Sequence, residues 1–186
     1  MKKLILLFAM ALVMQSCYVT IEIPPCMNGN LTPEQTNSIC WLSDTTSLIG
    51  LDNDDCIYAI NSNQMKDLLI AKDRTIVYRW LPYDMKNNIP IYFVQSYCDE
   101  NNIELYVITN EYTAAFAEID NVKNPIFSMN ISDCMINVEN KLEDKFYKEL
   151  FGNKYKKKFH IYYLENGEFV RTEDEMMNEK WKKKWE

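Results

Sequence analysis

Few residues in this chain could do chemistry: it has six cysteines and one histidine among 186 residues. No two cysteines have the two-residue spacing of a redox or zinc motif. A histidine-based metal site, a Ser-His-Asp triad or a Cys-His dyad would each depend on His160 alone. His160 lies in residues 158–164, which alternate like a strand, so we expect a structural histidine and no metal or other cofactor.

The cysteines divide by position along the chain. Beyond Cys17 there are five: Cys26, Cys40, Cys56, Cys98 and Cys134. An odd number leaves at least one thiol unpaired or paired between chains. Two of the first three could form a disulfide within an N-terminal extension, and the sequence leaves open which two. We expect Cys98, inside a helical pattern, to be a small buried apolar residue. The place of Cys134 is not fixed by the sequence, which leaves it as the alternative reactive thiol, with Cys98.

Residues 75–90 run from a buried-strand pattern into a helical pattern, which we expect to begin at Asn87 and to contain Pro90. This segment resembles thioredoxin, where such a junction carries a tryptophan, a Cys-x-x-Cys pair and a proline. The chain keeps Trp80 and Pro90 and has Asp84 and Asn87 where the two sulfurs would be. Thiol–disulfide exchange requires a thiolate, so the resemblance implies a degenerate redox site.

A second departure concerns the proline that thioredoxins hold in cis opposite the cysteines. Counting back from Asn166-Gly167, that position falls on Lys158 or Phe159. A competing alignment places Pro125 there. The first alignment predicts a trans peptide, because a cis bond before a non-proline residue costs about 2.5–4 kcal/mol.

The order of predicted elements supports the same resemblance over residues 57–185, in its longer, redoxin-like form. Helices are predicted after Asn61, from Asn87, over 113–120, over 141–151 and over 173–185, and strands over 75–81, 103–109 and 125–129. Asn166-Gly167 between two alternating segments predicts a hairpin. We therefore expect an α/β fold, a thioredoxin-like mixed sheet flanked by helices, with an N-terminal extension that is mostly loop and turn.

Asp84 has two alternative roles at this junction. It is expected to cap the helix, since an anion there is stabilised by backbone N–H groups; the alternative is a ligand-binding or acid–base role. The tyrosines around it are either core and rim residues or the lining of a peptide groove: Tyr78, Tyr83, Tyr92 and Tyr97.

The first seventeen residues predict export. Lys2 and Lys3 precede the uncharged apolar run 4–14, which is too short to span a bilayer and fits a signal peptide. Cys17 after Ser16 resembles a bacterial lipobox, which implies acylation of Cys17. An ordinary cleaved signal and a retained anchor are the alternatives. We expect a signal peptide over 1–16, a lipidated tether and extension over 17–56, and the thioredoxin-like domain over 57–186.

The net charge of the chain limits the kinds of partner that it can bind. Without residues 1–16 the chain keeps 18 basic and 27 acidic side chains. This acidic balance argues against a nucleic-acid partner. We expect attachment to a membrane through the lipid, in the bacterial envelope and at the outer membrane facing the periplasm, because Tyr18 rather than aspartate follows the cysteine.

Three functions remain open from the sequence. The leading hypothesis is a non-catalytic thioredoxin-like module that binds a protein or peptide. The alternatives are a thiol-dependent redoxin that uses Cys134 or Cys98, and an adhesion or glycan-binding lipoprotein with an exposed aromatic platform.

Overall fold

The computed structural model describes residues 31–84, 89–129 and 136–172. A single seven-stranded sheet organises these residues, in the order β1-β2-β5-β4-β3-β6-β7. The strands are β1 (Ile39–Trp41), β2 (Ile57–Ile60), β3 (Arg74–Arg79), β4 (Glu104–Thr109), β5 (Ile126–Met129), β6 (Ile161–Glu165) and β7 (Glu168–Thr172). The first five strands of the sheet order are parallel, and β6 and β7 are antiparallel to their neighbours.

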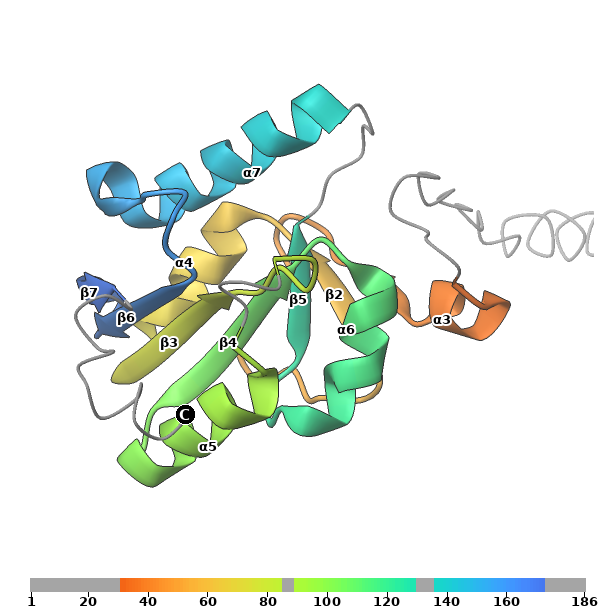
Figure 1. The fold of residues 1–186 in the computed structure, drawn as a ribbon, viewed down its shortest axis with the longest axis horizontal. Helices are drawn as coiled ribbons and strands as arrows, with labels where there is room; N and C mark the ends of the chain where they lie inside the picture. Colours follow the sequence, from red (N-terminus) through yellow and green to blue (C-terminus); the bar gives the residue numbers. More distant parts are fainter. Residues whose placement is uncertain (1–30, 85–88, 130–135, 173–186) are drawn as a thin grey trace, which may run out of the picture.

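Helices cover both faces of the sheet (Figure 1). They are α3 (Pro33–Asn37), α4 (Ser62–Ile70), α5 (Ile91–Asn101), α6 (Tyr112–Glu118) and α7 (Ile136–Phe151), with short 3-10 turns at Ile119–Asn121 and Gly152–Lys154. α4 and α7 pack together on one face, and α5 and α6 lie on the other (Figure 1). This division follows from right-handed crossovers, since the chain moves one way along the sheet through α4 and back through α5 and α6. The predicted α/β class with a mixed, helix-flanked sheet is confirmed.

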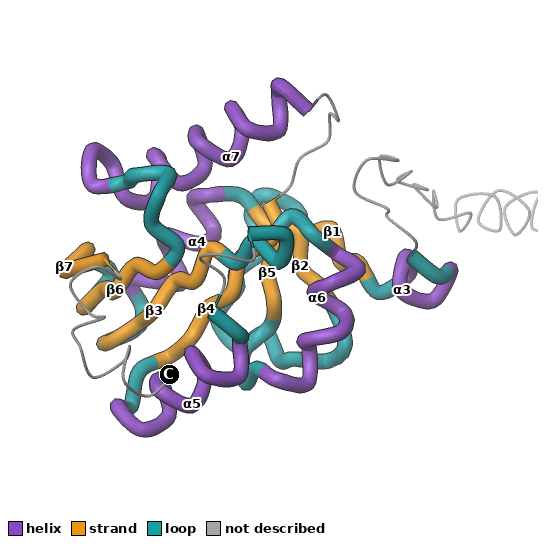
Figure 2. Tube along the Cα trace, viewed as in Figure 1, coloured by secondary structure: helices purple, strands orange, loops and turns teal. Residues whose placement is uncertain are grey.

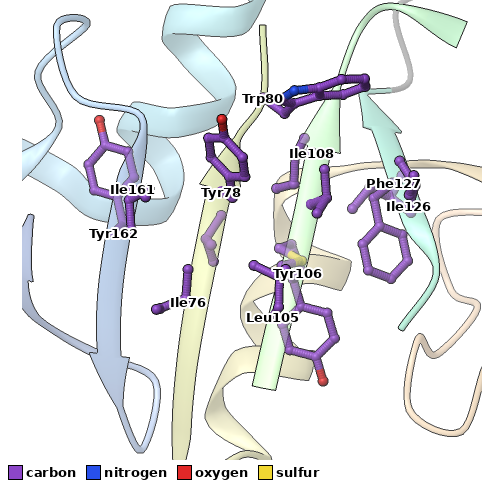
Figure 3. Packing of buried hydrophobic residues seen from close by; sticks show 14 of the residues in the cluster. Ile76, Tyr78, Trp80, Leu105, Tyr106, Ile108, Ile126, Phe127, Ile161 and Tyr162 are labelled. Carbon is purple, nitrogen blue, oxygen red and sulfur yellow. The ribbon is translucent and has the colours of Figure 1, made fainter. Parts of the chain in front are cut away.

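The core is a layer of aliphatic and aromatic side chains from the central strands. Figure 3 shows Ile76 and Tyr78 of β3 beside Leu105 and Ile108 of β4, and all four are at most 1% exposed. Since β2, β3, β4 and β5 are buried on both faces, apolar residues follow one another in their sequences and do not alternate with polar ones, although polar residues stand at several strand ends.

Local signals in the sequence explain several boundaries. Asn61 accepts from the backbone N–H of Gln64, whose side chain accepts from Asn61 N, a capping box that begins α4. Asn166 and Gly167 have φ of 50° and 78°, as a two-residue hairpin turn of type I′ requires, and join β6 to β7. Gly152, with φ of 58°, follows the end of α7.

The N-terminal extension differs from the expectation of mostly loop and turn. It contains α3, which begins with a capping box from Thr32 to Gln35, and β1, which pairs with β2. Neither β1 nor β2 was predicted. The loops and strands are distinguished along the Cα trace in Figure 2, where β1 and β2 lie at the end of the sheet remote from the hairpin. The predicted helix over 173–185 falls outside the described residues.

Candidate functional site

The candidate site forms where the carboxyl end of β3 meets the amino end of β6. These ends coincide because the two strands are antiparallel, and Arg79 N donates to His160 O at 2.7 Å. Trp80 follows directly; its N–H donates to Ile108 O at 2.9 Å, and its ring lies buried at the strand end (Figure 3). Leu81 to Asp84 then make a turn, with Asp84 N donating to Leu81 O at 2.9 Å.

The helix after this turn begins later than predicted. α5 starts at Ile91, with Pro90 in the N-cap position and no side-chain cap, so Asp84 does not cap it and the expected helix start at Asn87 is wrong. Proline fits just before a helix because it has no N–H to lose. The buried Tyr78 hydroxyl fixes the backbone that leads into α5: it accepts from Ile89 N at 3.0 Å and donates to Ile89 O at 2.6 Å. Asn87 lies outside the described residues.

Asp84 faces the only histidine of the chain. His160 Nε2 lies 3.5 Å from Asp84 Oδ2, with the imidazole 3% exposed and the carboxylate 30% exposed. Burial lowers the pKa of His160, the positive charge of Arg79 lowers it further, and Asp84 opposes both. The imidazole is therefore neutral at pH 7, and Asp84 is the solvent-facing member of the pair.

A buried ion pair lies behind His160. Arg79 Nε donates to Glu143 Oε1 of α7 at 2.6 Å, and the two side chains are 3% and 4% exposed. Burial works to lower the pKa of Arg79, but the hydrogen bond and the charge of Glu143 outweigh it and raise that pKa. The guanidinium also lies 5.7 Å from the ring centroid of Tyr147. Arg79 thus stays charged inside the protein.

The loop before β6 is held by buried side chains. Arg79 Nη1 donates to Lys157 O at 3.0 Å, and the single proton of the Tyr162 hydroxyl is shared between Lys156 O and Phe159 O, at 3.0 and 3.3 Å. Three carbonyls of the segment that leads to His160 are therefore already engaged. The backbone of this segment is fixed by these hydrogen bonds, so a ligand at the site would bind mainly through side chains.

Of the two segments aligned above with the cis-proline of thioredoxins, one lies opposite Asp84. The peptide before Phe159 is trans, and His160, one residue further, faces Asp84. Pro125 precedes β5, which β4 separates from β3. The position opposite Asp84 is thus the start of β6, in agreement with the Lys158–Phe159 alignment.

The tyrosines and cysteines divide between core and surface. Tyr78 is fully buried, whereas Tyr83 and Tyr92 are 60% and 49% exposed. Cys98 is fully buried in α5, and burial raises its pKa to about 12. Cys40 lies in β1 and Cys56 directly before β2; in the strand order, β5 and β4 separate these two strands from β3. Cys17, Cys26 and Cys134 lie outside the described residues.

Sequence reasoning identified Asp84 but missed the residues that the fold brings to it. Arg79 was visible as the single charge at the end of a buried strand pattern. Glu143 is spaced three and four residues from the buried Phe146 and Tyr147, so it shares the apolar face of its helix. A charge of each sign within apolar surfaces signals a buried ion pair, because such charges are almost never buried unpaired.

The described residues contain no group of three or more His, Cys, Asp or Glu side chains that could hold a metal ion. Among the helices in the same ranges, none is long and apolar enough to cross a bilayer. No protein-family model matches the chain, and neither does any curated protein or solved structure.

Proposed function

We propose that this chain is a lipid-anchored envelope protein whose thioredoxin-like domain binds a protein or peptide partner without thiol chemistry. The observation that carries the proposal is the Asp84–His160 pair. It occupies the strand-to-helix junction where a thioredoxin would hold its redox cysteines.

The thioredoxin-like assignment is supported by the order of elements. β3, α5, β4, α6, β5, α7 and the β6–β7 hairpin follow one another as the resemblance implies, with the hairpin antiparallel to β3. β3, which leads directly into Trp80, lies inside the sheet between β4 and β6, and the helix after it lies on the face opposite α4.

The absence of thiol chemistry is supported by the described cysteines. Disulfide exchange needs an accessible thiolate of lowered pKa. Cys98 is inaccessible and its pKa is raised to about 12, and Cys56 has a raised pKa as well. Asp84 and His160 supply a carboxylate and a neutral imidazole, neither of which reduces a disulfide.

A binding role is supported by what this edge presents. Tyr83 is 60% exposed and Asp84 30% exposed on one turn, an aromatic face beside a hydrogen-bond acceptor. The neighbouring carbonyls are engaged internally, so a partner would be recognised through these side chains rather than by strand addition.

The binding role is tested by photo-crosslinking in the producing cells. A photoreactive phenylalanine analogue at position 83 should give a discrete adduct, and Asp84→Asn, which keeps the shape but removes the charge, should reduce its yield at least several-fold. The control is the same analogue at Ile70, which is 67% exposed at the end of α4. Equal adducts at positions 83 and 70, or none at 83, would contradict the proposal.

The anchor is tested separately by labelling cells with a fatty-acid analogue. Wild-type protein should incorporate the label and Cys17→Ala should not, because stable attachment needs the acyl chains. Equal labelling of the two proteins would remove the lipid anchor from the proposal, and recovery of label in inner-membrane fractions would remove the outer-membrane location.

A further inference from the structure

Two cysteine sulfur atoms meet where the N-terminal extension joins the sheet. Cys40 is the middle residue of β1, and Cys56 directly precedes β2, the strand that pairs with β1 in parallel. The register places Cys40 opposite Tyr58, so Cys56, two residues earlier, is directed to the same face of the pair. Ile57 N donates to Ser38 O at 3.0 Å, which fixes the two backbones beside each other. The two Sγ atoms are 2.6 Å apart, closer than sulfur atoms pack without a bond.

We propose that Cys40 and Cys56 form a disulfide bond that fastens β1 to the core sheet. Each thiol gives up its proton as the S–S bond forms. The two electrons pass to an acceptor disulfide, that of an oxidised thiol oxidoreductase or of oxidised glutathione, which becomes two thiols. Such bonds persist in oxidising compartments, so their presence in cells rests on the export that is part of the proposed function.

The surroundings make this bond structural rather than catalytic. Burial, the neighbouring Cys40 and the carboxylate of Asp54 together raise the pKa of Cys56 to about 12. Asp54 is held beside the pair by the Tyr58 hydroxyl, at 2.6 Å. A catalytic cysteine requires the opposite environment, one that stabilises the thiolate. A disulfide removes the titratable group from this site.

The position also explains what the bond would do. β1 has three residues, and in the part of the chain that the structure describes it is the edge strand of the sheet, paired with β2 alone. Three residues of pairing hold a strand weakly, and the bond closes a loop between positions 16 residues apart. The bond thus keeps the extension, and the tether before it, attached to the domain.

The first test is a peptide map of the protein purified from the producing cells, with thiols blocked by N-ethylmaleimide at lysis. Trypsin does not cut between Lys3 and Lys66, whereas a protease that cleaves after Asp and Glu separates Cys26, Cys40 and Cys56 at Glu34, Asp44 and Asp52. The unreduced digest should contain one linked peptide with Cys40 and Cys56, while Cys98 should be alkylated after denaturation. A bond from Cys26 to either residue would overturn the proposal.

The second test is a thermodynamic cycle on the protein in detergent. Cys40→Ser, Cys56→Ser and the double variant should share one decrease in Tm, about 6–12 °C, because the bond needs both sulfurs. A phosphine reductant should lower the Tm of the wild type by the same amount and leave the double variant unchanged. Additive effects of the two single substitutions would show independent packing and contradict a bond.

A third arm separates this proposal from the export on which it rests. Reduced, folded protein is incubated with oxidised glutathione and mapped again. A Cys40–Cys56 link that forms here but is absent from cells would sustain the pairing and count against export. Two alkylated thiols in both arms would overturn the disulfide, whatever the location of the protein.

Discussion

His160 lies behind Asp84, with its Nε2 3.5 Å from Asp84 Oδ2. Asp84 follows β3 and His160 directly precedes β6, two strands that are antiparallel neighbours, and the imidazole is buried while the carboxylate reaches solvent. The fold therefore places a neutral imidazole beneath the solvent-facing carboxylate of Asp84.

This arrangement predicts a loss of stability in mild acid. The pKa of His160 is lowered in the folded state, so the unfolded chain takes up a proton first as pH falls through about 6.5. Unfolding is then favoured, and the free energy of unfolding should decrease from pH 7 towards pH 5.5. Urea unfolding at a series of pH values measures this.

Histidine titration can be assigned without ambiguity because His160 is the only histidine. The variant His160→Gln should lose the pH dependence above pH 5.5 and keep the decrease at lower pH that comes from carboxylates. Parallel pH profiles for the wild type and this variant would contradict the role of burial.

The Arg79–Glu143 pair predicts a large cost for removing one partner. Glu143→Gln leaves a buried guanidinium without its counter-charge, which should reduce the free energy of unfolding by about 3–5 kcal/mol. The double variant Arg79→Met/Glu143→Leu removes both charges and should lose less than Glu143→Gln. Urea unfolding monitored by circular dichroism measures these losses. If Glu143→Gln lowers the free energy of unfolding by less than about 1 kcal/mol, the Arg79 guanidinium does not depend on Glu143 for its counter-charge.

Two glycines give a matched test of the hairpin packing. Gly152 and Gly167 both have positive φ, but a Cβ at Gly152 meets nothing within 4 Å, whereas one at Gly167 lies 2.9 Å from Ile70 Cα. Gly152→Ala should cost about 1–2 kcal/mol from the backbone conformation alone. Gly167→Ala should cost about 1–3 kcal/mol more, because backbone cannot move aside as a side chain does. Equal costs would place the hairpin away from α4.

The sequence predicted elements whose signals are local and missed those that depend on the tertiary fold. The Asn61 capping box and the Asn166-Gly167 turn are complete within a few residues. β2 is a four-residue apolar run directly before an N-cap, too short for any periodicity to distinguish it. Pro90 fits equally inside the first turn or just before it, so the start of α5 was misplaced.

The site was only half predictable for the same reason. Asp84 could be found from its place after Trp80, within one continuous segment. His160, directly before β6, faces Asp84, and Glu143 of α7 pairs with Arg79 of β3; the tertiary fold brings these residues together. Sequence spacing carries no information on these contacts, because residues far apart in the chain become neighbours through the fold.

An insulin-reduction assay with dithiothreitol tests most directly the proposal that the domain has a thioredoxin-like arrangement without thiol chemistry. The purified protein should give no turnover above buffer, since the junction presents Asp84 and His160 and the described Cys98 is buried with a raised pKa. The variant Cys134→Ser should behave identically. Turnover by the wild type that disappears in Cys134→Ser would contradict the account and identify a thiol-dependent redoxin.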